Sequence, residues 1–290
     1  MFSVIIATYN RVALLTKTLE SLFRQEYAEF EIVVANDGST DGTHAYLERL
    51  AAEGRIIYTH HANSGLAATR KAALDRTRGE FIAITDNDCV VPADWLKRLA
   101  RHFEDPQVAG VGGATETGNP ESVYALTNDL INNYFKGVLN GRPGIPPYVT
   151  GNNVAYRRSA LEKAGGPDLR FQFGAEDRDL SYRVERYAGR VVYDPTIVIG
   201  HFNDTDFSGF VRQQYHQGRG SRLYYALSGE GGSRPSTIPA SAYLGLLLFP
   251  FRQFSIGKAA WISFLIVLGQ AATVVGFAAA LAAPAPGPKK

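Results

Sequence analysis

The stretch "AITDNDCVVPADW" at residues 83–95 ends an apolar run at Thr85 and then presents two carboxylates, Asp86 and Asp88, before Pro92. Side chains at alternate positions of an extended chain can converge on one ion only if the backbone bends, and Pro92 favours such a bend. Hard oxygen ligands of this kind suit Mg²⁺ or Mn²⁺, which proteins usually hold together with substrate phosphates. A solvated turn rich in Asp and Asn is the alternative that this stretch alone leaves open.

Short apolar strands and amphipathic helical patterns alternate before this stretch. The predicted strands are "SVIIAT" (3–8), "EIVVAN" (31–36), "RIIYTH" (55–60) and "EFIAIT" (80–85). Helices are predicted after Asn10 as an N-cap, around 42–53 and around 66–77. Continuous apolar strands separated by helices indicate an α/β fold with a mainly parallel sheet covered on both faces.

The carboxyl ends of such strands form the usual ligand-binding edge of the sheet. Thr8-Tyr9, Asn36-Asp37 and Asp86-Asp88 all lie at predicted strand ends, so we expect them to share one crevice. Asp37 in "NDGSTDGT" is placed to hydrogen-bond a ribose or a base edge. The same segment also suits turns and a helix cap, and the sequence does not decide between these roles.

Three further polar groups follow downstream. Glu176 and Asp177 stand at a predicted helix start in "FGAEDRDLSYRVERY" (173–187), where acids either offset the macrodipole or form a base with a raised pKa. His201 follows the strand "RVVYDPTIVIG" (190–200) and is either structural or a ligand that completes the metal site. The segment "RQQYHQGRGSR" (212–222) fits a mobile phosphate-closing element or a solvated helix end.

Composition limits the alternatives. The chain has 290 residues and a net charge of +2, so no strong basic field indicates a nucleic-acid partner. Its lone Cys89 excludes an intramolecular disulfide and fits a reducing compartment, and "MFSVIIATYNR" reads as a strand, not a signal peptide. Residues 110–118 fail the dinucleotide-binding glycine spacing, and the chain has neither a phosphate-loop motif nor a nucleophile elbow.

The C-terminal part is apolar. Residues 259–283 are uncharged, which predicts a transmembrane helix, with a buried helix of a soluble protein as the alternative. Residues 240–258 start with a 12-residue apolar run (240–251) that is too short to span a bilayer, and they predict an interfacial or re-entrant segment. A Gly-, Ser- and Pro-rich linker is predicted at 229–239 and a tail at 284–290, and flanking cations on both sides leave the orientation open.

The motifs in their order resemble family 2 glycosyltransferases of the GT-A fold. The resemblance covers about residues 2–222 and rests on "VIIATYNR" (4–11), "NDGSTDGT" (36–43), "NSGLAATRKAAL" (63–74), "TDND" (85–88), "TGNNVAYRRSALEKAGGPD" (150–168), "AEDRDLSYR" (175–183) and "GHF" (200–202). It implies a Rossmann-like catalytic domain at 1–228 that transfers a sugar with inversion from a nucleoside-diphosphate donor, usually UDP-linked.

The resemblance also implies roles for single residues. Asp88 would be the principal metal ligand, with Asp86 beside it and His201 reaching the metal or the diphosphate. Asp177 would be the catalytic base, and Glu176 would help to orient the acceptor. The implied donor-binding residues are Thr8, Tyr9, Asn10, Arg11, Asp37, Gly65, Arg70, Asp86, Asn87 and Arg219. The implied acceptor-binding residues are Gly151, Asn152, Asn153 and Glu176, within or beside a segment at 112–150 that we expect to shape the acceptor side.

Two departures from the family's processive synthases narrow the expected activity. Those enzymes carry a Q-x-x-R-W signature and several membrane spans, whereas this chain has "QQYHQGRGS" without Trp and one clear apolar span. We therefore expect limited sugar addition, to a lipid-linked or cell-surface glycan precursor, with the catalytic part facing the cytosol. The alternatives are a nucleotidyltransferase that makes sugar nucleotides and an inactive glycan-binding or scaffold protein of the same fold.

Overall fold

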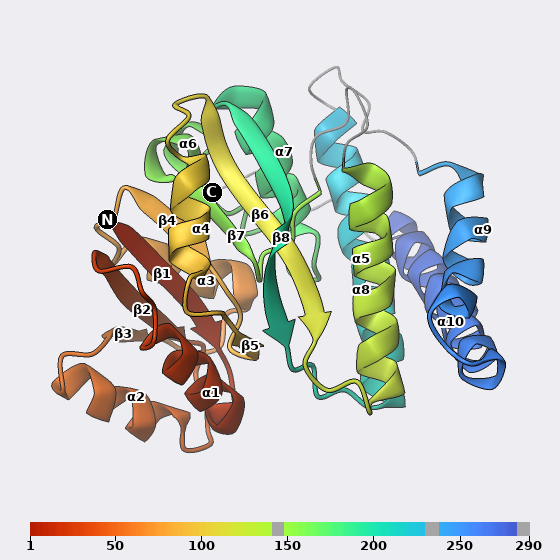
Figure 1. Cartoon of the computed structure of the whole chain (residues 1–290), viewed down its shortest axis with the longest axis horizontal. Coiled ribbons are helices and arrows are strands. Elements are labelled where there is room, and N and C mark those ends of the chain that lie inside the picture. Colours follow the sequence, from red (N-terminus) through yellow and green to blue (C-terminus); the bar gives the residue numbers. More distant parts are fainter. Residues whose placement is uncertain (141–147, 230–237, 283–290) are drawn as a thin grey trace.

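The computed structural model describes residues 1–140, 148–229 and 238–282. Over these ranges an eight-stranded sheet is flanked by helices, and a layer of long helices stands beside it (Figure 1). The strands are β1 (Phe2–Thr8), β2 (Phe30–Asn36), β3 (Ile57–His60), β4 (Phe81–Ile84), β5 (Cys89–Val90), β6 (Val108–Thr117), β7 (Val154–Arg157) and β8 (Arg190–His201). The helices over the sheet are α1 (Val12–Leu22), α2 (Thr43–Ala52), α3 (Leu66–Leu74), α4 (Trp95–His102), α6 (Arg158–Lys163) and α7 (Glu176–Tyr187).

The sheet has the order β3-β2-β1-β4-β7-β6-β8-β5. Strands β1 to β4 are parallel to one another, as the alternation of strands and helices predicts. The second half is mixed, because β7 runs antiparallel between β4 and β6, and β5 pairs antiparallel with the end of β8. This mixed α/β sheet with helices is the architecture of the GT-A fold.

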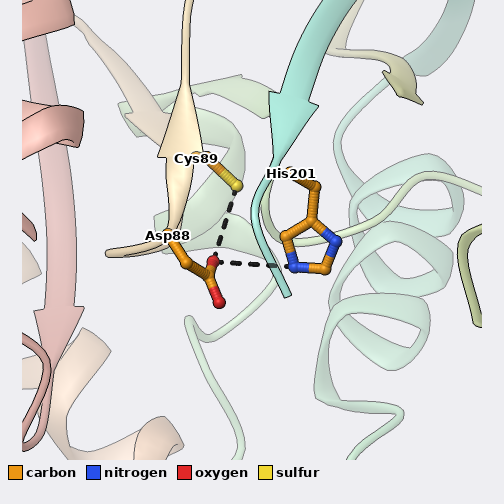
Figure 2. Close-up of side chains that lie close together, drawn as sticks. All are labelled: Asp88, Cys89 and His201. Atoms are coloured by element: carbon orange, nitrogen blue, oxygen red, sulfur yellow. Dashed lines mark hydrogen bonds and ion pairs between the residues drawn. The ribbon is translucent and has the colours of Figure 1, made fainter. Parts of the chain in front are cut away.

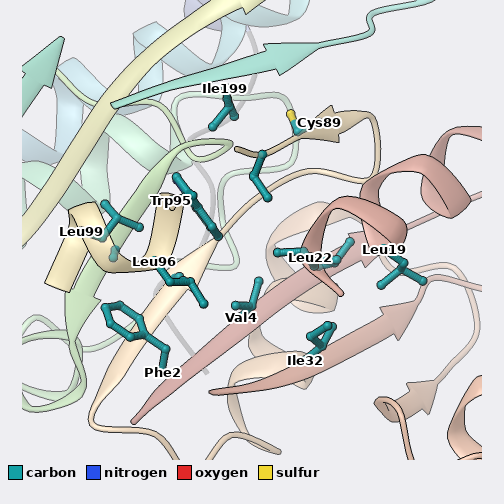
Figure 3. Close-up of a cluster of buried hydrophobic side chains, with 14 of the residues drawn as sticks. Phe2, Val4, Leu19, Leu22, Ile32, Cys89, Trp95, Leu96, Leu99 and Ile199 are labelled. Atoms are coloured by element: carbon teal, nitrogen blue, oxygen red, sulfur yellow. The ribbon is translucent and has the colours of Figure 1, made fainter. Parts of the chain in front are cut away.

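The core lies on both faces of the sheet. On one face, Val4 of β1 and Ile32 of β2 pack with Leu19 of α1 and with Trp95 and Leu99 of α4 (Figure 3). On the other face, Ile5 and Val33 belong to a second buried cluster that includes Ala73 of α3 and residues of α6 and α7. Because adjacent strand residues face opposite sides, burial on both faces explains the continuous apolar runs of β1 and β2.

The predicted N-cap at Asn10 is wrong. Helix α1 begins at Val12 with Arg11 in the capping position, and Asn10 adopts a φ of 50°. Its side-chain oxygen accepts hydrogen bonds from the backbone N–H groups of Thr40 at 2.7 Å and Asp41 at 3.3 Å. Asn10 therefore joins the loops that follow β1 and β2 and fixes one wall of the predicted crevice.

A second group of helices forms the layer beside β6 and β8. It consists of α5 (Val123–Leu139), α8 (Phe207–Gly229), α9 (Ala240–Leu248), the 3-10 helix η1 (Phe249–Arg252) and α10 (Ile256–Ala282). Residues 212–222, predicted as a mobile element or a helix end, lie inside the continuous helix α8. Most of the predicted linker (residues 230–237), residue 283 and the tail at 284–290 lie outside the described residues.

Among the described residues, α10 is the one helix long and apolar enough to cross a membrane. Only 22% of its most apolar 18-residue window is buried inside the protein. Its length agrees with the predicted segment at 259–283, and whether it crosses a bilayer stays a prediction.

Candidate active site

Asp88 and His201 meet at the carboxyl-end edge of the sheet (Figure 2). Strand β5 pairs with the end of β8 so that Cys89 lies opposite His201, and this register brings Asp88 to the imidazole. The distance from His201 Nε2 to Asp88 Oδ1 is 3.6 Å, and the Sγ of Cys89 lies 3.8 Å from the same oxygen. One ligand atom from each of the three residues lies within 4.8 Å of the other two.

The other side of the His201 ring is held by Asp129 of α5. The distance from His201 Nδ1 to Asp129 Oδ1 is 2.9 Å, and Thr117 donates its hydroxyl to the second oxygen of Asp129 at 2.9 Å. Burial alone would lower the pKa of His201, but the hydrogen bond to Asp129 and the charge of Asp88 outweigh it and raise the pKa to about 9. Before a cation binds, the imidazole is therefore protonated near neutral pH and ion-paired to both carboxylates.

Asp88 itself is buried beside charges of both signs. Burial and the neighbouring Asp86 raise the pKa of its carboxyl group, while His201 and Arg11 oppose that rise. The guanidinium of Arg11 forms an ion pair with the second oxygen of Asp88. Cationic side chains thus lie against both oxygens of this carboxylate.

Arg70 connects this centre to the start of α7. Its buried guanidinium donates to Asp86 at 2.7 Å and to Glu176 at 2.8 Å. Burial alone would lower the pKa of Arg70, but Asp86, Glu176 and Asp177 raise it above the usual value. The backbone of Gly151 runs so close to this guanidinium that a Cβ would lie 2.8 Å from Nη1, so a larger residue there would displace the head group of Arg70.

Glu176 and Asp177 begin α7, as predicted, and differ in their surroundings. Burial, followed by the charge of Asp177, raises the pKa of Glu176 to about 7, against the opposing effect of Arg70. Asp177 accepts hydrogen bonds from the backbone N–H groups of Gly151 at 3.0 Å and Arg178 at 2.7 Å. These two donors fix the orientation of the Asp177 carboxylate.

The donor types at this centre fit a hard divalent cation at Asp88 and His201. A carboxylate oxygen and an imidazole nitrogen are ligands for Mn²⁺-like ions. Burial raises the pKa of the Cys89 thiol, so the softer sulfur stays protonated and is a poor ligand. Asp86, the third predicted ligand, is instead paired with Arg70 and lies outside this cluster.

The predicted donor-binding residues fall into two groups. Thr8 accepts a hydrogen bond from the side chain of Asn87 at 2.8 Å, and both residues are buried. Asp37 accepts from the backbone N–H groups of Ser64 at 2.7 Å and Gly65 at 3.1 Å, which holds the loop before α3. This favours the structural reading of Asp37, and Gly65 has the positive φ of 90° that such a turn needs.

The remaining predicted donor residues lie at the surface of the crevice or away from it. Tyr9 is exposed, and Arg11 reaches Asp88 as described. Arg219 of α8 stacks on Phe173, with 3.7 Å between the guanidinium carbon and the ring centre. Phe173 precedes Glu176 by three residues, so α8 borders the loop that leads into α7.

Among the predicted acceptor residues, Gly151 lies between Arg70 and Asp177, while Asn152 accepts from Thr150 at 2.7 Å. Asn153 is fully buried, and it donates to the carbonyl groups of Ala114 and Ile197 and accepts from the indole N–H of Trp95 at 2.9 Å. All of these Asn153 contacts are internal, so its observed role is to join β6, β8 and α4.

Comparison with known proteins identifies the family. Residues 3–165 match the family model "Glycosyl transferase family 2". The N-acetylglucosaminyltransferase of *Azorhizobium caulinodans* is 29% identical over 245 residues, covering 78% of this chain and 60% of that protein. The uncharacterized glycosyltransferase EpsJ of *Bacillus subtilis* is 32% identical over 220 residues, covering 66% of this chain and 58% of that protein. The chain thus spans a little more than half the length of these relatives.

Solved structures share the fold. The mannosyltransferase PcManGT of *Pyrobaculum calidifontis*, in complex with GDP-Man and Mn²⁺, superposes with a TM-score of 0.65 at 22% identity, covering 97% of this chain and 86% of that chain. Residues 1–349 of *S. aureus* TarS superpose with a TM-score of 0.53 at 18% identity, covering 95% of this chain and 88% of that chain. With the family match over residues 3–165, these findings establish that the chain belongs to glycosyl transferase family 2.

Proposed function

We propose that the protein is a metal-dependent, inverting glycosyltransferase that moves one sugar at a time from a nucleoside-diphosphate sugar to an acceptor hydroxyl at a membrane surface. The observation that carries this proposal is the approach of His201 Nε2 to Asp88 Oδ1, at 3.6 Å, close to Asp86, which Arg70 connects to the start of α7, where Glu176 and Asp177 lie. Arg70 makes this connection because it forms ion pairs with both Asp86 and Glu176. A transferase of this kind needs both a diphosphate site and a base within reach of one sugar.

The metal site serves the leaving group. Asp88 and His201 would hold a divalent cation, which would supply positive charge against the diphosphate as the bond between the sugar and the diphosphate breaks. Arg11 now contacts Asp88 and stands near enough to turn toward a diphosphate oxygen. UDP-linked sugars are the first donors to test, although PcManGT, which shares this fold, was solved with GDP-Man.

Asp177 serves the acceptor. Its carboxylate, oriented by the N–H groups of Gly151 and Arg178, takes the proton of the attacking hydroxyl. Inversion fits a single displacement in which Asp177 and the metal site act on opposite sides of the sugar. The buried pair of Glu176 and Arg70 then orients the acceptor beside the base.

Two observations favour an acceptor that belongs to the cell envelope. TarS of *Staphylococcus aureus*, named a poly(ribitol-phosphate) beta-N-acetylglucosaminyltransferase, is 32% identical over 134 residues. The apolar C-terminal helices favour an acceptor near a membrane, such as a lipid-linked glycan precursor of the cell envelope. Nucleotide sugars are made in the cytosol, so we place the catalytic part, residues 1–228, on the cytosolic side.

The test is product formation by the detergent-solubilised full chain with a panel of nucleoside-diphosphate sugars and membrane-lipid acceptors. The proposal expects release of a nucleoside diphosphate that stops with EDTA and returns with Mn²⁺ or Mg²⁺. Release of pyrophosphate would indicate a nucleotidyltransferase instead. Absence of any product across donors and acceptors would favour a glycan-binding or scaffold role.

A further inference from the structure

The outer surface of α9, η1 and α10 is mainly apolar, and we call its apolar part the apolar face. Its large members are Leu244, Phe251, Trp261, Phe264, Val274 and Leu281, which are between 46% and 68% exposed. Every exposed residue of α10 from 260 to 282 is apolar. The rings of Trp261 and Phe264 stack in the open, with 5.3 Å between their centres. A surface helix of a water-soluble protein has the opposite polarity, with its polar side outward.

The polar side chains of α10 turn toward the protein. Ser263 donates to the carbonyl of Leu247 at 2.8 Å, and Thr273 donates to the carbonyl of Gln214 at 3.2 Å. This arrangement satisfies the two hydroxyl groups internally and leaves only apolar side chains exposed between residues 260 and 282. It therefore fits a lipid neighbour, whether α10 crosses the bilayer or lies on it.

The packing of α10 against the rest of the protein favours lying on the bilayer over crossing it. Along its length it rests first on Leu130 and Ile131 of α5 and then on α8. Gly218 of α8 approaches the Thr273 carbonyl so closely that no Cβ fits there, and Gly276 meets the Tyr215 backbone in the same way. In Figure 1, α10 accordingly runs beside the long helices of the catalytic part and does not project away from them.

Helix α8 is too polar to lie inside the hydrocarbon of a membrane. It carries Arg212, Arg219 and Arg222, and its Gln213 and Gln214 hydrogen-bond Asn128 of α5 at 2.6 and 2.7 Å. Helix α5 in turn holds His201 through Asp129. If α10 crossed the bilayer while keeping these contacts, the arginines and the neighbouring site residues would enter the hydrocarbon, which is costly.

The net charge of α8, α9, η1 and α10 suits anionic lipids. Residues 207–229 and 238–282 contain five cationic residues, Arg212, Arg219, Arg222, Arg252 and Lys258, and neither Asp nor Glu. Arg252 and Lys258 are exposed at the turn between α9 and α10, at the rim of the apolar face. Cations beside an apolar surface strengthen binding to anionic phospholipid headgroups.

We propose that the apolar face lies flat in the surface of an anionic phospholipid bilayer, with α10 in the membrane plane and not across it. This rests on the membrane association proposed above and replaces the predicted span with an interfacial anchor. Helices α5 and α8 then separate the lipid from Asp88, His201 and Asp177. The crevice would therefore serve an acceptor hydroxyl that stands above the lipid surface.

Depth along α10 tests this geometry. Four variants of the full chain each carry one introduced cysteine with a nitroxide label, in place of Phe264, Val267, Val274 or Leu281. Each is bound to vesicles of phosphatidylcholine and phosphatidylglycerol. The native Cys89 is fully buried and stays unlabelled. The proposal expects all four labels at one depth. Since 17 residues of helix rise about 25 Å, a crossing helix would separate Phe264 and Leu281 by most of the bilayer and overturn it.

Sidedness gives an independent check. A membrane-impermeant thiol reagent is applied to Ser255→Cys and Ala282→Cys, with Asp75→Cys on α3 marking the catalytic side. The in-plane arrangement expects both ends of α10 to react from the side that modifies Asp75→Cys. Reaction of Ala282→Cys only from the opposite side would contradict it.

Vesicle binding tests the surface itself. Phe264→Glu should weaken partitioning at least about tenfold, because an apolar side chain loses its burial in lipid. Leu169→Glu, an equally exposed leucine outside the apolar face, should leave partitioning unchanged. Equal partitioning of Phe264→Glu and the original chain, or no binding to anionic vesicles, would overturn the proposal. Donor turnover in detergent is a separate readout, so loss of it would count only against the proposed enzyme activity.

Discussion

Asp129 and His201 lie 72 residues apart in the sequence and are joined by a 2.9 Å contact between Oδ1 and Nδ1. Asp129 is buried on α5, so the helix that packs against α8 and α10 also orients the imidazole at the proposed metal site. A carboxylate behind a metal-ligating histidine fixes its ring orientation and increases its basicity. The helical layer is thereby connected to the chemistry of the crevice.

Replacing Asp129 by Asn should lower the affinity for Mn²⁺ by about 10- to 100-fold, since the neutral amide orients the imidazole less firmly. Titration of free Mn²⁺ by electron paramagnetic resonance measures this without turnover. Asp75→Asn, an exposed Asp paired with Lys71, is the matched control and should bind Mn²⁺ normally. An unchanged Kd in Asp129→Asn would remove its positioning role.

Cys89→Ala should keep its Mn²⁺ affinity, because the buried thiol is protonated and contributes no ligand. The small cavity should cost about 1 kcal/mol of unfolding free energy. The same titration together with urea unfolding separates these effects. A large loss of Mn²⁺ affinity with an intact fold would place the sulfur in the coordination sphere.

Glu176→Gln should change the dependence of stability on pH. The pKa of Glu176 is raised from 4.5 to about 7 in the folded protein, so the folded state binds its proton more tightly than the unfolded chain. This stabilisation is fully present below pH 4.5 and is lost as the pH rises through 7. The Gln variant should therefore gain stability relative to the original chain between pH 5 and pH 8 in metal-free thermal unfolding. A stability difference that does not vary with pH would show that Glu176 titrates normally.

Asp177→Asn should reduce transfer by about 10²- to 10⁴-fold, the usual contribution of a general base. Asn has one acceptor oxygen and so keeps only one of the two hydrogen bonds from Gly151 and Arg178. Because its size is unchanged, donor binding should remain near that of the original chain, with only a modest fall in melting temperature. Initial rates of nucleoside-diphosphate release and calorimetric donor binding measure the two properties. Near-normal rates with Asn at position 177 would exclude it as the base.

Some elements of the fold and site could be predicted from the sequence, and others could not. The apolar runs of β1 and β2 and the acidic start of α7 are local patterns, and the structure confirms them. The antiparallel insertion of β7 between β4 and β6 is a choice of pairing partner, which local periodicity does not encode. The same limit applies to Asp129, the single acidic residue of α5, which only the tertiary structure brings to His201.

The inward polarity of α10 is a similar case. Its composition indicated a membrane segment, but the direction of Ser263 and Thr273 and the contact with α8 depend on how the helix is packed. Asn153 likewise looked like an acceptor ligand beside Gly151, and its position in the core assigns its hydrogen bonds to the protein itself.

The central claim is that Asp88 and His201 form a metal-dependent site for a nucleoside diphosphate. Thermal unfolding of the solubilised chain with UDP, GDP, dTDP or CDP, each with and without Mn²⁺, tests it most directly. A ligand at 100 times its Kd stabilises the folded state by about 2.7 kcal/mol, which raises the melting temperature measurably. We predict that one nucleotide does so only with Mn²⁺, and that His201→Ala abolishes the shift. No shift with any nucleotide, or an equal shift in His201→Ala, would contradict the account.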